Sequence, residues 1–265
     1  LTGEGADELF SGYANYRKRV REERITAILG SRISPLRALV PLMPALWQKD
    51  RIVKAIGLPL AQRYATIPNL FDRATHPALF SDALLAKQHT HIADYAEEFF
   101  NRCNSASYLE KIMNVDMRLW LPDDLLTKVD RATMAYSLEA RVPYLDHKFI
   151  EFVAQLRPEF KQHGKATKYL LKKVAEKYLP RDIIYRNKQG FVMPLTQWLD
   201  GGLKPRMEHA LSADGLERRG LFRRGALQRV LGEHRRGRSN HAGRLWALTV
   251  LELWFERYLP DFRLD

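Results

Sequence analysis

The sequence predicts a mainly α-helical protein. Apolar residues recur every three or four positions along most of the 265 residues, which is the spacing of one face of an α-helix. No segment shows the alternation of apolar and polar residues that is typical of a half-buried β-strand. Prolines interrupt the helical pattern mainly between residues 30 and 80, so we expect short elements there and longer helices elsewhere.

The first predicted helix begins near Asp7 and runs to about Leu29. Its apolar face contains Leu9, Tyr13, Tyr16 and Val20. Residues 30–80 contain six prolines and are expected to form brief helices and turns rather than one long element.

The middle of the chain continues the helical pattern. Residues 81–101 predict one or two helices, and residues 107–120 predict another. Asp123 or Asp124 could cap a helix that follows, because short acidic side chains accept hydrogen bonds from the first backbone N–H groups of a helix. An extended turn over residues 141–147 is expected to precede a short helix.

Two helices are predicted near the end of the chain. Residues 165–178 are strongly amphipathic, so one side of this helix needs a protein surface to cover it. Residues 245–258 are apolar almost all round, which predicts a buried helix.

The composition is that of an ordinary globular protein, with 46% hydrophobic and 28% charged residues. The richest apolar stretch, Ile33 to Trp47, contains Arg37 and three prolines, so we expect no membrane-spanning helix. A single cysteine, Cys103, excludes an internal disulfide framework, and the chain has no Cys/His pair at zinc-ligand spacing. We therefore expect a cytoplasmic location, where thiols stay reduced.

The formal net charge of +12 favours anionic partners. Much of the excess lies in residues 17–21 and 218–238, which are rich in arginine. These runs could contact RNA or a membrane, or they could be solvated helix faces and loops. No aromatic residues alternate with the arginines to stack on bases, so we favour the second interpretation and consider nucleic acid an unlikely partner.

Residues 2–8, here called the acidic-glycine loop, contain the strongest functional signal. Gly3 and Gly5 can adopt backbone conformations that bring the chain close to an anion, and a helix start follows directly. The acids Glu4, Asp7 and Glu8 would repel a bare phosphate, so this pattern favours Mg-ATP, in which a divalent cation lies between carboxylate and phosphate. Alternatively, the glycines form a simple turn and the acids complement the helix dipole.

Residues 2–13, T-G-E-G-A-D-E-L-F-S-G-Y, resemble the S-G-E-G-x-D-E-x-F-x-G-Y signature of the glutamine-hydrolysing asparagine synthetase family. Residues 121–146 are similar in order and spacing to that family's D-x-x-L-x-x-x-D-R run and the S-L-E-x-R-x-P-F-L-D motif after it. A third block, residues 186–198, is similar to the family segment R-x-K-x-G-F-x-x-P-x-x-x-W. The resemblance extends over nearly the whole chain.

This resemblance implies the helical C-terminal part of an α/β adenine-nucleotide-hydrolase-like domain, the ATP pyrophosphatase domain. Its parallel sheet and pyrophosphate-binding loop are expected N-terminal to Leu1. Within residues 1–265 we expect the loop and its helix at 1–29, a proline-rich helical region at 30–105, a catalytic core at 106–200 and C-terminal helices at 201–265.

In the family reaction a carboxylate attacks the α-phosphorus of ATP, which gives an acyl-adenylate and releases pyrophosphate, and an amine then displaces AMP. The resemblance makes Asp7 a magnesium ligand and places Thr2, Gly3 and Gly5 against the nucleotide. It makes Glu4 a catalytic residue that assists adenylate formation and handles the amine, a task suited to a carboxylate base. Expected ligands are therefore ATP, Mg²⁺ and aspartate.

Lys188 matches a family lysine on a mobile segment and could bind pyrophosphate or the oxyanion of the second step. Asp124 and Asp130 could orient or share protons with Glu4, or they could cap helices and pair with nearby cations. We include Asp124 among the predicted catalytic residues. Glu139 and Arg141 are expected to form a buried ion pair that fixes the following turn.

Two family features do not occur in the sequence: an N-terminal catalytic cysteine and an S-G-G-x-D-S loop. We therefore expect a fragment that needs the glutaminase domain and the pyrophosphate-binding segment of the same polypeptide, and that is inactive alone. A homodimer is one assembly that such a fragment could form. Other family members offer alternatives: surface-polysaccharide amidotransferases, β-lactam synthetases and lasso-peptide cyclases. Glu4 favours the asparagine-forming branch over lactam formers. A basic helical nucleic-acid-binding module is the alternative from another class.

Overall fold

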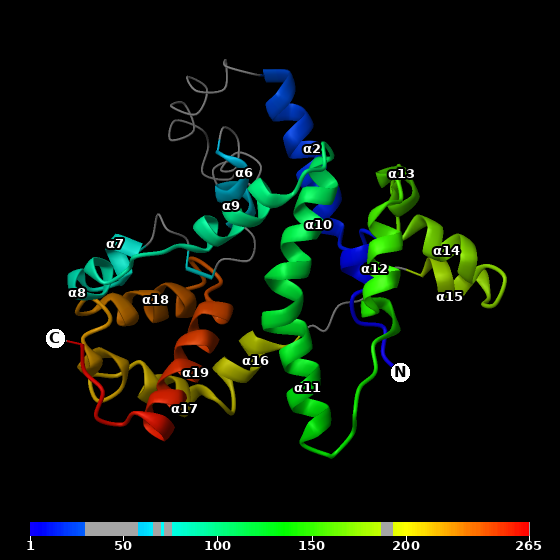
Figure 1. The fold of residues 1–265 in the computed structure, drawn as a ribbon. Coiled ribbons are helices and arrows are strands. Elements are labelled where there is room, and N and C mark those ends of the chain that lie inside the picture. The colour runs from blue at the N-terminus through cyan, green and yellow to red at the C-terminus, as the bar shows by residue number, and fades with distance from the viewer. Residues whose placement is uncertain (30–57, 66–69, 72–75, 187–192, 265) are drawn as a thin grey trace. The chain divides into compact units, whose positions relative to one another are not determined.

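The computed structural model is mainly helical, as the sequence predicts (Figure 1). It describes residues 1–29, 58–65, 70–71, 76–186 and 193–264. The chain divides into two compact units. Unit 1 comprises Leu1–Ile67 and Ile92–Lys188, and unit 2 comprises Pro68–His91 and Gln189–Asp265.

Unit 1 begins with two helices where the sequence predicted one. Helix α1 spans Ala6–Leu9 and helix α2 spans Ala14–Leu29. Between them, Ser11 has a φ of 56°, a left-handed conformation that no α-helix can continue through. The backbone N–H of Gly12 donates to the carbonyl of Asp7 at 2.8 Å, which closes the chain into a turn.

Helices α6 (Leu60–Ala65), α9 (Ile92–Arg102) and α10 (Tyr108–Arg118) form the main core of unit 1 with α2. Ser107 caps α10, because its hydroxyl accepts a hydrogen bond from the backbone N–H of Glu110 at 3.5 Å. The buried side chains of this core are Tyr16, Ala61, Tyr64, Ala65, Ala93, Ala96, Phe100, Leu109, Ile112, Met113 and Val115. Only the end of the predicted proline-rich region can be compared, because residues 30–57 lie outside the described part.

Helix α10 leads through Leu119 and Trp120 into a π-helical turn, η4 (Leu121–Leu126), and then into α11 (Thr127–Met134). The three elements follow one another as a nearly continuous column in Figure 1. Asp123 and Asp124 lie inside η4 and cap no helix, contrary to the expectation, because the helical backbone does not restart there.

A 3₁₀ turn, η5 (Pro143–Leu145), and helix α12 (His147–Ala154) follow. Asp146 caps α12 by accepting a hydrogen bond from the Phe149 backbone N–H at 3.1 Å. Phe149 and Val153 of α12 then pack in a second apolar cluster of unit 1 with Leu9 and Phe10.

The sequence predicted one long helix over residues 165–178, but the structure has a small β-hairpin at the start of this segment. After α13 (Pro158–Lys161), strand β1 (Gln162–His163) pairs antiparallel with β2 (Ala166–Thr167). Helix α14 spans only Tyr169–Ala175 and is followed by α15 (Arg181–Tyr185).

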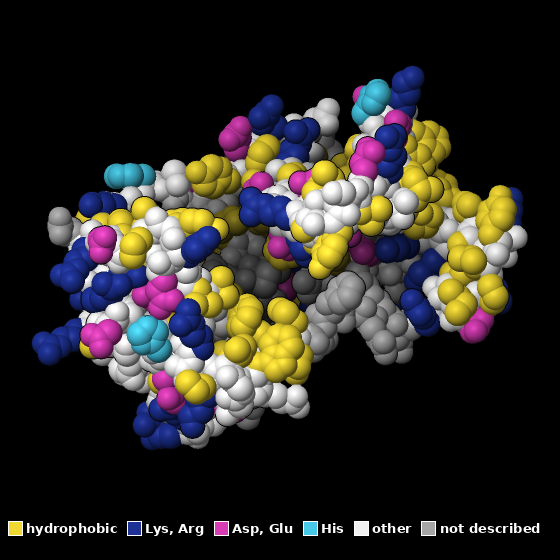
Figure 2. Space-filling model, turned by 90° about the horizontal axis from the view of Figure 1, so that it is seen from below, with side chains coloured by type: hydrophobic (Ala, Val, Ile, Leu, Met, Phe, Trp, Pro, Cys, Tyr) yellow, Lys and Arg dark blue, Asp and Glu magenta, His cyan; other side chains and the backbone are white. Residues whose placement is uncertain are grey.

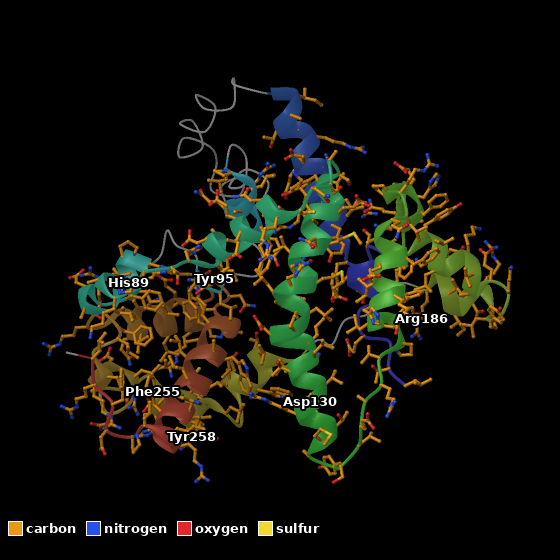
Figure 3. The ribbon with its side chains drawn as sticks, in the orientation of Figure 1. His89, Tyr95, Asp130, Arg186, Phe255 and Tyr258 are labelled. Carbon is orange, nitrogen blue, oxygen red and sulfur yellow. The ribbon has the colours of Figure 1, made fainter. Side chains whose placement is uncertain are left out.

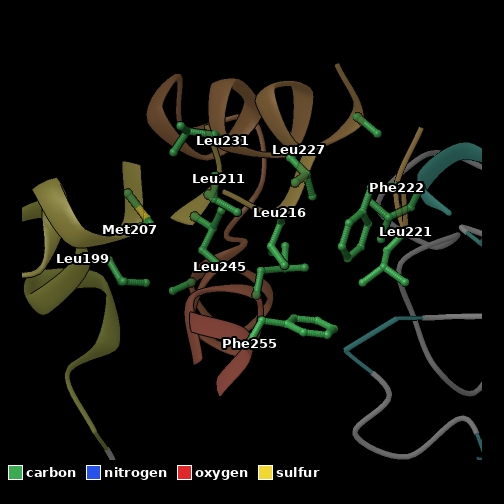
Figure 4. Close-up of a cluster of buried hydrophobic side chains, with 14 residues drawn as sticks. Leu199, Met207, Leu211, Leu216, Leu221, Phe222, Leu227, Leu231, Leu245 and Phe255 are labelled. Carbon is green, nitrogen blue, oxygen red and sulfur yellow. The ribbon is translucent and has the colours of Figure 1, made fainter. Parts of the chain in front are cut away.

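Unit 2 contains the remaining described helices. These are α7 (His76–Leu79), α8 (Asp82–Ala86), α16 (Leu195–Asp200), α17 (Lys204–Ala210), the 3₁₀ helix η6 (Leu216–Arg219), α18 (Ala226–Arg235) and α19 (Ala242–Tyr258). Their apolar side chains converge on a single cluster that includes Leu211, Leu216, Leu227 and Leu245 (Figure 4).

Helix α19 is central to this cluster, as its apolar composition predicted. Leu245, Leu248 and Phe255 are buried, whereas Trp254 is 46% exposed and departs from the expectation of burial all round. None of the helices in the described part of the chain combines the length and apolar composition that a membrane crossing needs.

Candidate active site

A backbone hydrogen bond from the Thr2 N–H to the Arg141 carbonyl, at 2.8 Å, attaches the acidic-glycine loop to the rest of unit 1. Gly5 has a φ of 86°, which a residue with a side chain rarely adopts. A β-carbon at Gly5 would also lie 2.3 Å from Cδ2 of Leu145. Position 5 therefore requires glycine for two reasons: its backbone is left-handed, and Leu145 occupies the space that a side chain would need. Gly3, in contrast, faces open space.

Thr2 and Glu4 line the start of this loop. The Thr2 hydroxyl oxygen is buried and has no hydrogen-bond partner among the described residues. A buried polar atom without a partner is uncommon in native proteins and is a natural contact for a ligand. Glu4 is half-buried in the turn that leads into α1.

Asp7 lies in the first turn of α1 and pairs with Lys168. The distance from Lys168 Nζ to Asp7 Oδ1 is 2.9 Å, and both side chains are about a quarter exposed, at 26% and 23%. Lys168 directly precedes α14, so the hairpin and the acidic-glycine loop are joined at the predicted metal ligand. From the sequence alone, Lys168 is expected to be structural.

The side chain of the next residue, Glu8, points into the interior of the protein. Its carboxylate is 1% exposed and accepts a hydrogen bond from the Tyr13 hydroxyl at 2.5 Å. Burial raises the pKa of Glu8 above its usual range, and burial together with the nearby carboxylate raises the pKa of Tyr13. Glu8 therefore supports the loop from inside and does not present its charge to a ligand.

A second buried carboxylate, Asp116 of α10, lies in the same unit. It accepts a hydrogen bond from the Tyr64 hydroxyl at 2.6 Å, and burial raises the pKa of Asp116 above its ordinary value. The guanidinium of Arg19 donates to the Tyr64 carbonyl at 3.2 Å and lies over the Tyr64 ring, 5.5 Å from its centroid. Burial lowers the pKa of Arg19.

Three other predicted residues are placed differently. Asp124 is exposed in η4, and Asp130 is exposed further along α11 (Figure 3). Neither forms a hydrogen bond or ion pair with Glu4 in the described residues. Lys188 lies outside the described residues, although Arg186, two positions earlier, is described and exposed.

Glu139 and Arg141 do form an ion pair, at 3.1 Å, but their side chains are 70% and 72% exposed. The expectation of a buried pair is therefore wrong. The neighbouring residues between α11 and η5 are largely exposed, so nothing covers these two charges.

The residues of the loop fit a magnesium-bound polyphosphate. No group of three or more His, Cys, Asp or Glu side chains is arranged as a metal site in the described part of the chain. Magnesium is usually held by one or two carboxylates together with substrate phosphates and water, so a single carboxylate such as Asp7 suffices. The Thr2 hydroxyl lacks a partner among the described residues, and no described atom lies within 4 Å of the position that a β-carbon at Gly3 would take.

Two of the contacts that support the loop could not be found from local sequence patterns. Lys168 lies far from Asp7 in the chain, and a lone lysine before a helix carries no signal for such a pairing. The Glu8–Tyr13 contact is local, but it depends on the interruption of the helix at Ser11, which the apolar periodicity did not indicate.

Comparisons with known proteins identify the family to which the chain belongs. The family model described as asparagine synthase matches residues 1–256. Asparagine synthetase [glutamine-hydrolyzing] 1 of Bacillus subtilis (strain 168) is 27% identical over 98% of this chain and 41% of its own length. Putative asparagine synthetases of Mycobacterium bovis and of Mycobacterium tuberculosis strain H37Rv are each 32% identical over 96% of this chain and 38% of their own length.

The family model thus matches almost the full length of this helical chain with its acidic-glycine loop. The chain belongs to the asparagine synthase family. It spans about two fifths of the length of these curated relatives. No solved structure gives a significant match.

Proposed function

We propose that this chain forms one wall of the active site of an ATP-dependent, amide-forming ligase that converts aspartate to asparagine with ammonia from glutamine. The observation that carries the proposal is the acidic-glycine loop. Gly5 is held in a left-handed turn, the Thr2 hydroxyl lacks a partner among the described residues, and the Asp7 side chain is partly exposed. Membership of the asparagine synthase family supports the same reaction class.

In this proposal Asp7 holds magnesium, and Thr2, Gly3 and Gly5 lie against the nucleotide. A bound magnesium ion would neutralise phosphate charge and so permit the approach of a carboxylate anion. The Thr2 hydroxyl can donate to a phosphate or ribose oxygen. Gly3 has open space where a side chain would otherwise stand, so the backbone can approach the ligand closely.

Glu4 is proposed to assist adenylate formation, and therefore pyrophosphate release, and then to accept a proton from the incoming amine. A carboxylate in a half-buried turn can take a proton from ammonium or from the tetrahedral adduct as AMP leaves. Lys188 is proposed to stabilise negative charge on pyrophosphate or on the adduct, which a compact ammonium can do. Asp124 is proposed to orient the reacting groups from η4.

The proposal is tested with Glu4→Gln and Lys188→Ala in the intact enzyme, by measuring pyrophosphate release that depends on aspartate. Each variant should lose at least about a hundredfold in rate, the lower range for a general base or an oxyanion contact. Glu151→Gln, at an exposed position of α12, is the matched control and should retain full activity. Undiminished aspartate-dependent release in Glu4→Gln would refute the assignment.

The acceptor and the amine donor are part of the proposal. Because the chain spans about two fifths of its relatives' length, we propose that a glutaminase domain and a pyrophosphate-binding segment complete the enzyme in the cytoplasm. A panel of carboxylates tests the acceptor. Activity with a polysaccharide carboxylate or a peptide side chain, and none with aspartate, would move the protein to another branch of the family.

Nucleic-acid binding is a weaker alternative, because several arginines of residues 218–238 are engaged within unit 2. Arg219 pairs with buried Glu252, Arg223 pairs with Asp82, and Arg235 pairs with a glutamate of α17. On the face drawn in Figure 2, acidic side chains lie among the basic ones. A gel shift with RNA at low salt tests this alternative, which requires an affinity that falls steeply with salt.

A further inference from the structure

Asp7 already has a cationic partner in this structure, and that partner is supplied by the protein. Lys168 Nζ lies 2.9 Å from Asp7 Oδ1, and about three quarters of each side chain is shielded from solvent. Water and salt screen such a pair less than they screen one on an open surface. The carboxylate proposed to hold a metal is therefore neutralised by an internal ammonium group.

The backbone holds both members of this pair in place. Lys168 adopts a left-handed φ of 52°, and its N–H donates to the Phe10 carbonyl at 3.0 Å. The Gly12 N–H donates to the Asp7 carbonyl at 2.8 Å. Residues 7–12 thus form one turn to which both charged residues are attached by main-chain hydrogen bonds.

Gly12 leaves the space that the ion pair fills. A β-carbon at Gly12 would lie 1.8 Å from Asp7 Oδ1 and 2.4 Å from Lys168 Cε. The close packing of three residues around one contact indicates a defined geometry rather than two mobile side chains that meet on a surface.

We propose that Lys168 is a built-in counter-ion of Asp7, so that metal binding at this carboxylate exchanges one cation for another. The inference rests on the proposed function, in which Asp7 binds magnesium. Before the nucleotide arrives, the ammonium group holds the carboxylate in position and weakens its attraction for a divalent ion. Lys168 is therefore a positioning residue that sets the metal requirement of the site.

The sign of the effect follows from electrostatics. Removing a fixed positive charge from beside a carboxylate strengthens its attraction for another cation. Ion pairs on open protein surfaces correspond to up to about a fivefold change in an equilibrium constant, which sets the scale of the effect expected here. Lys168→Met should therefore bind a divalent ion about two- to fivefold more tightly in the absence of nucleotide, whereas a purely structural lysine would leave metal affinity unchanged or lower it.

The test titrates the 265-residue chain with Mn²⁺ and follows binding by water-proton relaxation. Lys165→Met is the matched control, because it removes the same charge from an exposed site three residues away and should bind Mn²⁺ as the wild type does. Lys168→Arg keeps the charge and should also resemble the wild type. Circular dichroism verifies that each variant is folded, and Lys168→Gln replaces Lys168→Met if that variant unfolds.

Asp7→Asn separates failure of this inference from failure of the proposed function. If Asp7→Asn weakens Mn²⁺ binding but Lys168→Met does not strengthen it, Asp7 binds metal and the counter-ion proposal is wrong. If Asp7→Asn has no effect on Mn²⁺ binding, the metal role of Asp7 itself is wrong. A metal-free double-mutant cycle of the two residues in thermal unfolding adds a check, since zero coupling would also overturn the pair.

Discussion

Arg219 and Glu252 form a two-point ion pair in the interior of unit 2. Arg219 Nε lies 2.6 Å from Oε2 of Glu252, and Nη2 lies 2.7 Å from Oε1, with the side chains 0% and 1% exposed. The guanidinium carbon lies 4.5 Å from the centroid of the Phe255 ring. The remaining nitrogen, Nη1, donates at 3.3 Å to the carbonyls of Leu259, Pro260 and Phe262. This one side chain therefore ties η6 to α19 and to the C-terminal segment.

Breaking this pair should strongly destabilise the protein. Glu252→Gln leaves the Arg219 charge buried without its counter-charge, which costs about 3–5 kcal/mol in comparable sites. Urea unfolding followed by tryptophan fluorescence measures the loss. The double replacement Arg219→Met with Glu252→Leu should recover part of it, because no charge then remains buried.

The matched control for this pair is Arg206→Met. Arg206 pairs with Glu256 at 2.8 Å but is half exposed, so its loss should change the free energy of unfolding by less than about 1 kcal/mol. Equal effects of Glu252→Gln and Arg206→Met would show that burial does not control the strength of these contacts.

Asp116 should make stability depend on pH. Burial raises the pKa of Asp116 in the folded protein above its ordinary value of 3.8, so the folded state holds this proton more tightly than the unfolded chain does. The resulting stabilisation is complete below pH 3.8 and is lost as the pH rises through the folded-state pKa. Asp116→Asn should remove this dependence, so its stability relative to the wild type should increase with pH by about 1.4 kcal/mol for each unit of pKa shift.

Two further variants define this effect. Tyr64→Phe removes a hydrogen bond that lowers the pKa of Asp116, so the decline of stability with pH should extend to higher pH. Glu151→Gln, an exposed acid on α12, should leave the pH profile unchanged. Guanidinium unfolding at a series of pH values gives the profiles, and parallel curves for Asp116→Asn and the wild type would contradict the assignment.

Alanine at Gly5 and at Gly12 should produce different defects. Gly5→Ala forces an alanine into a left-handed conformation, which costs about 1–2 kcal/mol, and adds a collision with Leu145. At Gly12, the atoms nearest to an added β-carbon belong to the side chains of Asp7 and Lys168, which can move. The melting temperature of Gly12→Ala should therefore fall less, while the ion pair is displaced.

Thermal unfolding and nucleotide binding together distinguish the two glycine defects. Gly202→Ala is the control, because open space surrounds that position. Gly12→Ala should weaken Mg-ATP binding in the intact enzyme with only a small change in melting temperature. Wild-type nucleotide affinity in Gly12→Ala would show that the placement of Asp7 is not critical.

The C-terminal end of α11 should promote self-association of the isolated chain. Met134, Tyr136 and Leu138 are 53%, 89% and 62% exposed, and they lie within five consecutive residues. Exposed apolar groups of this kind mark surfaces that bind other protein. Leu138→Lys should lower the apparent mass in size exclusion with light scattering, whereas Ala14→Lys, at an exposed site on α2, should not. A wild-type chain that stays monomeric at high concentration would contradict this prediction.

Helix existence was predictable where a local signal was sufficient. The Ser107 cap and the apolar spacing after it define α10, and the apolar composition of residues 245–258 defines most of α19. Tertiary contacts overrode the local pattern elsewhere. Lys168 interrupts a strongly amphipathic segment because its left-handed backbone bonds to Phe10 and its side chain reaches Asp7. No periodicity in residues 165–178 carries information about that distant partner.

The sequence predicted a list of site residues, whose roles stay predictions, but it did not predict how these residues are arranged. The loop motif identified Asp7, Gly5 and Glu4, since its residue types suit a metal-bound phosphate. It did not reveal that Glu8 faces the interior or that Asp7 is already paired, because both depend on the turn at Ser11.

The π-helical turn η4 has a consequence for comparing this protein with its relatives. A π turn bonds residue i to residue i+5, so it accommodates an additional residue without ending the helix. Each residue of an α-helix rotates the next by about 100°, as 3.6 residues complete a turn. If the π turn did not take up the additional residue, every side chain after it would be rotated by that angle. A relative with a one-position gap in its alignment to residues 121–126 can therefore form an ordinary α-helical turn there and still aim its counterpart of Asp130 in nearly the same direction.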